Sequence, residues 1–337
     1  MFLEFKVIKQ QRGAALILAL LIVSVVVILA SALSSDFLLA LRRVENQLHS
    51  QQAHAYLRGA EVMARQVLQM DFKNANNKID HISEGWLEIE QNMLLDQGQM
   101  SGRLSDLQGR FNLNDLPGTV TGGKYTPSQL QFIRLLKELN LERPLDQLEA
   151  EELTRAVIDW IDTNENTDLR GGAETPYYSS GEDLKVPMRA GNQALNSISE
   201  LMWIKGMSKE IYLALSPLIS VLPEGSKINV NTASAEVLQA MIDNGSGTEG
   251  EQLVRDRDGD ETNPSQGYGT TEDFINQFTA ITGMKKADVP DNIRVDSEYF
   301  LLSAQTLFMD RIFLSQSVLH RDADGKAQVI IRSYTGI

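Results

Sequence analysis

The chain has 337 residues, a net charge of −14 and no cysteine. The length allows about one to three domains with a sizeable core. The lack of cysteine excludes disulfides, thiol catalysis and thiolate metal sites. The acidic excess argues against nucleic acid as a partner, because phosphate binding needs a basic face.

The N-terminal segment is predicted to anchor the chain in a membrane. Residues 1–12 are short and basic, and Gly13 precedes an uncharged run from Ala14 to Ser35. A run of about 20 apolar residues is long enough to cross a bilayer as a helix. The basic flank is expected to stay in the cytoplasm, so the residues after Asp36 are expected on the far side.

Three interpretations of this start compete. The first is a cleaved secretory signal, with residues 30–32 as its small-residue cleavage site, and the second is a plain signal anchor. The third is a leader of the prepilin kind, cut between Gly13 and Ala14. Apolar residues continue at spacings of three and four as far as Met70, which predicts one helix from Ala14 to Lys73, with two helices in tandem as the alternative. A cleaved signal has no reason to run on into an amphipathic helix, so the third interpretation is favoured.

Short strand-like runs flank the middle of the chain on both sides. Before it lie residues 86–90, 93–95 and 102–107, with a turn at 96–99, and residues 110–114 are predicted to extend this hairpin. After it lie residues 299–306, 311–319 and 328–332. The simplest inference is a single sheet built from both flanks.

The middle of the chain is predicted to be helical and internally repeated. Residues 111–115 match residues 228–232, and residues 197–208 match residues 270–285. In each second block a Ser or Thr suits a helix N-terminus, and an apolar-x-Gly-Met sequence suits a tight turn between helices. The pattern predicts a duplicated helix-hairpin-helix unit. Its asparagines resemble those of competence-type DNA receptors, but on so acidic a chain they are expected to cap helices and tie turns.

An acidic loop in the first repeat is the strongest candidate metal site. Its oxygen-bearing side chains alternate at Asp162, Asn164, Asn166 and Asp168. Calcium takes six to eight oxygen ligands, and alternate residues of a tight loop can all point inward. The loop is not an EF-hand, because its sixth position is Thr167 and not glycine. Asp159 and Glu174 are expected to join the site, and Glu182 and Asp183 are expected to complete this site or a second one.

Two weaker interpretations of the acidic residues stay open. The loop at residues 162–174 can be a solvated acidic turn that binds no ion. A second candidate for calcium lies at residues 256–261, where Arg255 and Arg257 oppose a cation.

Taken together, these features resemble the K-type minor pseudopilin family of the bacterial type II secretion system. The resemblance covers the leader that ends at Gly13, the long helix, both strand groups, the inserted repeats and the acidic loop. It implies a non-enzymatic protein at the tip of a periplasmic pseudopilus, with its anchor in the inner membrane and calcium in the inserted domain. It implies as partners the prepilin peptidase, the I- and J-type minor pseudopilins and other pseudopilins, and it implies methylation of the new N-terminal amine.

One departure from the general pilin pattern supports this family. If Ala14 is the first mature residue, the fifth is Leu18, where most pilins have glutamate. In pilins that glutamate pairs with the amine of the neighbouring subunit. A carboxylate in lipid is costly unless it is paired, and a subunit at the tip has no neighbour above it to neutralise.

The expected fold is therefore α+β: a pilin-like fold, with a long N-terminal helix packed on an antiparallel sheet, and a large inserted all-α domain of duplicated helix-hairpin-helix (SAM-like) units. The expected parts are a leader (1–13), a membrane span (14–35), the outer half of the helix (36–73), sheet segments (74–114 and 297–337) and an insertion (115–296) with repeats at about 115–222 and 226–290. The competing functions are an anchored metal-dependent hydrolase and a membrane-anchored periplasmic DNA receptor.

Overall fold

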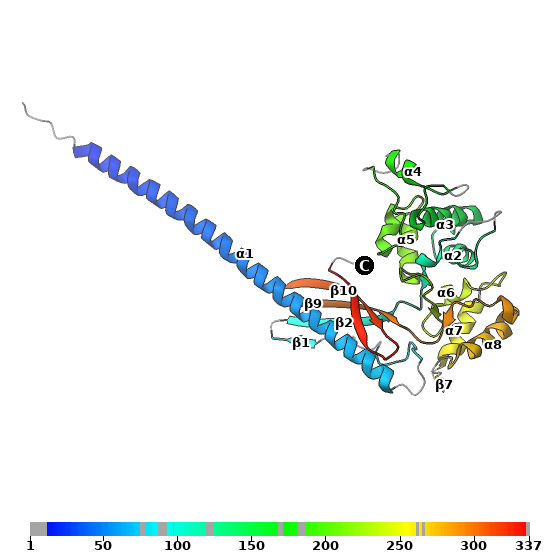
Figure 1. Ribbon diagram of the computed structural model, residues 1–337. Helices are drawn as coiled ribbons and strands as arrows, with labels where there is room; N and C mark the ends of the chain where they lie inside the picture. The colour runs from blue at the N-terminus through cyan, green and yellow to red at the C-terminus, as the bar shows by residue number, and fades with distance from the viewer. Residues whose placement is uncertain are drawn as a thin grey trace, which may run out of the picture. The chain divides into compact units, whose positions relative to one another are not determined.

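The computed structural model describes residues 12–74, 79–86, 93–96, 98–118, 124–167, 171–180, 187–260, 263–264 and 267–334. The chain forms two compact units, residues 1–55 and residues 56–337. Helix α1 (Arg12–Asn74) begins in the first unit and ends in the second (Figure 1). The prediction of one uninterrupted helix from Ala14 to Lys73 is confirmed.

The first unit contains α1 as far as Ala55, and the uncharged run from Ala14 to Ser35 lies within it. No proline interrupts this helix, and its large apolar side chains from Leu16 to Leu33 are exposed. In the part of the chain that the structure describes, α1 is the one helix long and apolar enough to cross a membrane. Exposed apolar side chains on such a helix suit contact with lipid and not with water.

The second unit contains a five-stranded antiparallel sheet in the order β1-β2-β9-β10-β11. Its strands are β1 (Met93–Leu95), β2 (Gly98–Asp106), β9 (Tyr299–Phe308), β10 (Arg311–Arg321) and β11 (Ala327–Ser333). Strand β2 pairs with β9 from Gly98 opposite Phe308 to Asp106 opposite Phe300. Figure 1 shows these two strands side by side, one cyan and one orange. Both flanks of the chain therefore contribute to one sheet, as the sequence predicted.

The end of α1 covers one face of this sheet. Leu57, Ala60, Ala64 and Leu68 recur at spacings of three and four, so they lie on one side of the helix. They pack in one core with alternate residues of the sheet, among which are Leu104, Phe300, Leu302, Ala304 and Leu319. Period-two burial along β9 and helical-period burial along α1 thus meet in a single apolar layer.

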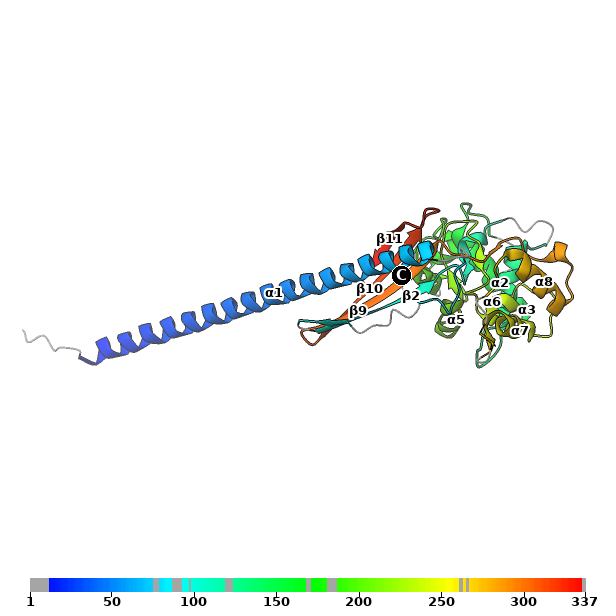
Figure 2. The same ribbon diagram turned by 90° about the horizontal axis from the view of Figure 1, so that it is seen from below.

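A second and larger core lies in the segment between β2 and β9. Its helices are α2 (Pro127–Lys137), α3 (Gln147–Ile161), α4 (Thr175–Ser180), α5 (Lys209–Leu215), α6 (Ala235–Gln239), α7 (Glu249–Asp258) and α8 (Thr271–Thr282). Short 3₁₀ helices are η1 (Leu113–Asp115), η2 (Ile198–Trp203), η3 (Ser216–Leu218) and η4 (Lys286–Asp288). One contiguous apolar cluster runs from Phe111 to Ile293 through these elements, whose helices gather together in Figure 2.

The structure corrects two expectations about this insertion. First, the insertion is not purely helical. It also contains the parallel pairs β3 (Phe111–Asn112) with β4 (Ile219–Ser220) and β5 (Ile228–Asn229) with β8 (Ile293–Arg294), and the antiparallel pair β6 (Gly259–Asp260) with β7 (Asn263–Pro264). The two parallel pairs join the start of a helical segment to its end.

Second, residues 110–114 do not extend the first hairpin, because Phe111 and Asn112 pair with β4 instead. Their partners are residues 219–220, which lie far along the chain, and a local sequence pattern does not show such a pairing. Of the predicted strand at 86–90, Trp86 lies in a turn, and residues 87–90 lie outside the described residues.

Candidate metal centre

The acidic loop is positioned by the end of helix α3. Asp146 caps the start of this helix by accepting the Glu149 N–H at 2.9 Å, and the helix ends at Ile161. Asp159 therefore lies in the last turn, and Asp162 is the C-cap residue with extended backbone. Glu174 directly precedes helix α4. A helix end and a helix start thus bring three carboxylates together across the loop.

The carboxylates of Asp159, Asp162 and Glu174 each have an oxygen within 4.8 Å of the others. Two ligands on opposite sides of a calcium ion, each at about 2.4 Å, lie about this far apart. Asp159 and Glu174 are buried, and Asp162 is half-buried. The spacing and the burial are those of a site open to solvent on one side.

Glu174 is the residue with the least support from protein donors. Its side chain is 1% exposed, and neither carboxylate oxygen has a hydrogen-bond partner of ordinary geometry among the described residues. Burial, together with the negative charges of Asp159 and Asp162, raises the pKa of Glu174 to about 7. An unpartnered buried carboxylate is costly unless a proton or a metal ion neutralises it.

An aromatic pair and the backbone of residues 191–192 pack against the end of α3, which carries part of the site. The Trp160 and Tyr178 rings pack edge to face at a centroid distance of 5.0 Å. The Asn192 N–H donates to the Trp160 carbonyl at 2.8 Å, and a Cβ on Gly191 would lie 2.9 Å from the Trp160 Nε1 atom. Residues 191–192 therefore fit closely against the end of α3, which fixes the position of Asp159.

The predicted ligands fall into three groups. Asp159, Asp162 and Glu174 come together as described. Asn164 and Asn166 are exposed, and the Asn164 Oδ1 atom accepts the Asn166 N–H at 2.7 Å. Asp168, Glu182 and Asp183 lie outside the described residues. Calcium binding by this set stays a prediction. The three residues that come together offer carboxylate oxygens, which fit a hard cation.

At the weaker candidate site, residues 256–261, the central carboxylate of Asp258 is already paired with an arginine. Arg257, which is buried, donates to Asp258 at 2.6 Å and to the Val230 carbonyl at 3.2 Å. His81 also contacts Asp258, at 3.3 Å. Asp258 thus balances Arg257 in a structural ion pair, which speaks against a cation at this position.

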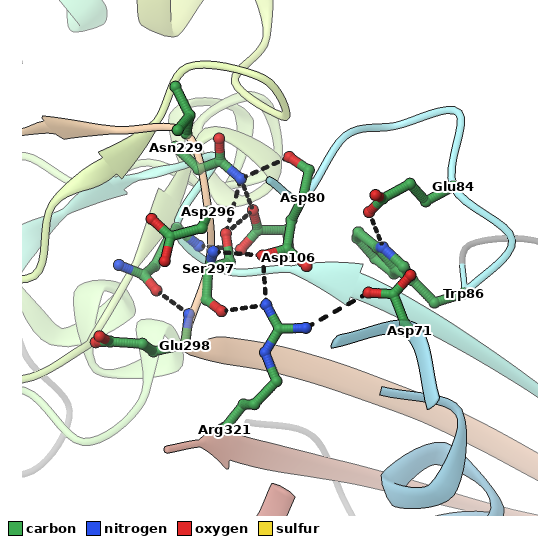
Figure 3. A network of polar contacts seen from close by, with 12 residues as sticks. Asp71, Asp80, Glu84, Trp86, Asp106, Asn229, Asp296, Ser297, Glu298 and Arg321 are labelled. Carbon is green, nitrogen blue, oxygen red and sulfur yellow. Dashed lines mark hydrogen bonds and ion pairs between the residues drawn. The ribbon is translucent and has the colours of Figure 1, made fainter. Parts of the chain in front are cut away.

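Sequence reasoning missed a polar network where the insertion meets the sheet. The buried Asn229 Nδ2 atom donates to the Asp80 carbonyl at 3.0 Å, to Asp106 Oδ2 at 3.1 Å and to Ser297 Oγ at 2.8 Å (Figure 3). The Asp80 carboxylate accepts the Ser297 N–H and a bond from Arg321. The repeated Asn-x-Asn blocks were the signal for this network, but the partners of Asn229 lie far away in the chain, from 68 residues for Ser297 to 149 residues for Asp80.

The predicted processing residues lie at the start of α1. Gly13 and Ala14 belong to its first turn and are exposed, and Leu18 is 60% exposed one turn later. The leader residues 1–11 lie outside the described residues.

Comparison with known proteins decides the family. Models described as type II secretion system (T2SS), protein K, match residues 109–224 and residues 228–295. The type II secretion system protein K of Pseudomonas aeruginosa is 36% identical over 329 residues, which cover 96% of this chain and 92% of that protein. The chain belongs to the protein K family of the type II secretion system. It is a K-type minor pseudopilin, as the sequence indicated. Proteins of this family are structural components of the secretion system.

Two further likenesses support this family across nearly the whole chain. Protein K of Pectobacterium carotovorum is 32% identical over 335 residues, 97% of both chains. A chain in the crystal structure of the GspK-GspI-GspJ complex from enterotoxigenic Escherichia coli matches with a TM-score of 0.74 and 26% identity. The match covers 88% of this chain and 100% of that one.

Proposed function

We propose that this chain sits at the tip of the type II secretion pseudopilus and helps to initiate its assembly and protein export, without enzymatic activity. The observation that carries the proposal is the insertion between β2 and β9, which has its own core from Phe111 to Ile293. A body of this size beside the sheet hinders repeated side-by-side packing of identical subunits. A single copy at an end of the filament avoids that obstruction.

The proposed topology is a single pass through the inner membrane with the second unit in the periplasm. The exposed apolar half of α1 supports it, as do the basic residues that precede Gly13. Prepilin peptidase is proposed to cut between Gly13 and Ala14, so that α1 begins with Ala14, whose amine can be methylated. Replacing Gly13 by valine tests this step, because a branched side chain is expected to block the peptidase. Mass spectrometry should then find uncleaved precursor, and normal processing of Gly13→Val would refute the step.

The proposed partners are the I- and J-type pseudopilins, named in the solved complex that this chain resembles. Co-expression of the full chain with its own I- and J-type partners should give a complex that survives affinity purification through any one subunit. Absence of such a complex, with each protein folded by circular dichroism, would contradict the proposed place at the tip.

The fold is proposed to be pilin-like, with two helix-hairpin-helix units in the insertion. Gly206 and Gly283 both have positive φ, +82° and +69°, in the turns that the sequence pattern predicts. Ser197 and Thr270 cap the elements η2 and α8 that precede these turns. The boundaries of the two repeats, about 115–222 and 226–290, stay a prediction.

Calcium is proposed to bind at Asp159, Asp162 and Glu174 as a structural ion. An ion that binds only the folded chain adds stability by mass action, about 2.7 kcal/mol at one hundred times its dissociation constant. Chelator should therefore lower the melting temperature of the full chain in detergent, and Glu174→Gln should weaken the response. Asp243→Asn, on an exposed carboxylate elsewhere in the insertion, is the control. Identical melting of the wild type in calcium and in chelator would leave only a solvated acidic loop.

A further inference from the structure

A second group of carboxylates lies outside the site described above, beside the junction of α1, the sheet and the insertion. Asp71 comes from the last turns of α1, and Asp80 and Glu84 come from residues 79–86. Each of the three has an oxygen within 4.8 Å of the others. Figure 3 shows the carboxylates of Asp71 and Glu84 on the same side of Asp80.

Protein donors satisfy only part of this group. Glu84 Oε2 accepts the Trp86 Nε1–H at 2.7 Å and the His81 N–H at 3.2 Å. Asp71 Oδ2 lies 3.5 Å from Arg321, which also binds Asp80 Oδ2. Asp80 is 1% exposed, yet its Oδ1 atom has no hydrogen-bond partner among the described residues. A buried carboxylate oxygen beside two further carboxylates is strongly unfavourable unless something positive reaches it.

The local charge is not balanced by Arg321 alone. Asp71, Asp80 and Glu84 carry a charge of −3 when ionised, and Arg321 carries +1, so the group has a net charge of −2. Asp296 and Glu298 lie nearby, but both are paired with Arg294 at 2.7 and 3.1 Å. A divalent cation has the charge that this group lacks.

There is also space beside the group. A cavity of about 200 Å³ is lined by Asp71, Asp80 and Arg321, though not by Glu84, and by the same measure one water needs only about 10–15 Å³. Burial raises the pKa of Asp71 and Glu84, and with the nearby charge of Asp106 it raises that of Asp80 to about 7. The alternatives for Asp80 Oδ1 are therefore a shared proton or a metal ion.

We propose that Asp71, Asp80 and Glu84 bind a divalent cation of the calcium class, separate from any ion at Asp159, Asp162 and Glu174. All three donors are carboxylate oxygens, which suit a hard cation, and waters in the cavity supply its remaining ligands. Asp80 bridges the cation through Oδ1 and Arg321 through Oδ2. The ion thereby fastens the end of α1 to residues 79–86 and, through Arg321, to strand β10.

Trp86 gives this site its own spectroscopic signal. Its indole donates to Glu84, so a terbium ion bound there lies close enough for the excited ring to sensitise terbium emission. The experiment uses the full chain in detergent with Glu174→Gln, which weakens the other candidate site. Calcium binding is measured by equilibrium dialysis, and terbium emission is measured under tryptophan excitation.

The expected result is about one bound calcium per chain in the Glu174→Gln background, and terbium emission that calcium displaces. Adding Asp71→Asn or Glu84→Gln should weaken calcium binding by about tenfold or more. Trp86→Phe should reduce the emission but keep the calcium. The matched control is Asp322→Asn, which lines the same cavity without belonging to the group and should bind as its parent does.

Three results would overturn the proposal. They are no calcium bound in the Glu174→Gln background, calcium binding that Asp71→Asn and Glu84→Gln leave unchanged from that background, or a loss of binding after Asp322→Asn as large as the loss after Asp71→Asn or Glu84→Gln. The first of these would assign the shared proton to Asp80. Where Asp71→Asn does not fold, Glu84→Gln decides, because its amide still accepts the Trp86 and His81 bonds. In the reciprocal variant, Glu84→Gln with Glu174 intact, calcium binding reports on the site at Asp159, Asp162 and Glu174 alone. Comparing the two variants shows which of the two sites fails to bind calcium.

Discussion

Asn114 and Asn231 make the same set of contacts in the two halves of the insertion. Asn114 Nδ2 donates to the carbonyls of Leu195 and Leu222 at 3.1 and 2.9 Å, and its Oδ1 accepts the Leu195 N–H at 2.8 Å. Asn231 Nδ2 donates to the carbonyls of Tyr268 and Val295 at 2.9 and 3.3 Å, and its Oδ1 accepts the Tyr268 N–H at 2.7 Å. Each amide thus ties the start of its half to two later segments of the same half.

This equivalence predicts equal costs for two substitutions. Asn114→Leu and Asn231→Leu each remove three hydrogen bonds and leave buried backbone groups without partners, so each should lower the free energy of unfolding by about 3 kcal/mol. Urea unfolding of the full chain in detergent, followed by near-ultraviolet circular dichroism, measures the change. Asn276→Leu, at an exposed position of α8, should stay within about 0.5 kcal/mol. A large cost at one asparagine and none at the other would contradict the equivalence.

The sequence indicated the position of these asparagines but not their contacts. Their repetition was visible, because the blocks at residues 111–115 and 228–232 match. Their expected role was local, to cap the next helix and tie the turn. The turn is tied as expected, because Asn229 Oδ1 accepts the Asn231 N–H at 2.9 Å. Ser234, however, caps α6, and the side-chain NH2 groups of Asn229 and Asn231 reach segments far along the chain. Such partners depend on the packed fold and leave no periodic trace in the sequence.

The sheet was easier to anticipate than the two acidic groups. Alternating burial along β9 follows from its period-two apolar pattern, and that pattern is local. At the first group, the predicted set contained Asp159, Asp162 and Glu174, which the structure joins across the loop, but it also contained Asn164 and Asn166, which are exposed. At the second, Asp71, Asp80 and Glu84 follow no recognisable spacing, because they come together only where residues 79–86 pack beside the end of α1.

Glu61 and Arg332 join α1 to the edge strand β11 and provide a further test. Both oxygens of Glu61 accept bonds from Arg332 at 2.6 Å, and one of them also accepts Ser317 Oγ at 2.7 Å. Glu61 is buried, and its carboxylate is the bidentate partner of Arg332. Removing the charge of Glu61 therefore leaves Arg332 without this partner. Glu61→Gln should cost about 2 kcal/mol of unfolding free energy in urea. Glu251→Gln removes the exposed ion pair with Arg255 and should cost less than about 0.5 kcal/mol.

The same pair predicts a dependence on pH. Burial raises the pKa of Glu61, but hydrogen bonds from Arg332 and Ser317 outweigh it and hold the pKa below its ordinary 4.5. A carboxyl group with a lowered folded pKa stabilises the fold above its unfolded pKa and loses this contribution as pH falls through the folded value. The stability difference between the wild type and Glu61→Gln should therefore be constant near neutral pH and shrink below about pH 4.5. Urea midpoints across this range measure it, and a difference that grows on acidification would contradict the assignment.

Gly283 tests the tight turn after α8 without a change in packing. Its φ is +69°, in the left-handed region, and a Cβ built there meets no atom within 4 Å. Alanine at this position should thus cost about 1 kcal/mol through backbone strain alone, and asparagine should cost less because it tolerates this region. Gly59→Ala is the matched control, since Gly59 lies within α1 and its Cβ also meets no atom within 4 Å. In a helix the same substitution should stabilise by about 0.4–1 kcal/mol, so opposite signs at the two glycines are expected from urea unfolding. Equal signs would show that the turn at Gly283 does not hold its left-handed conformation in solution.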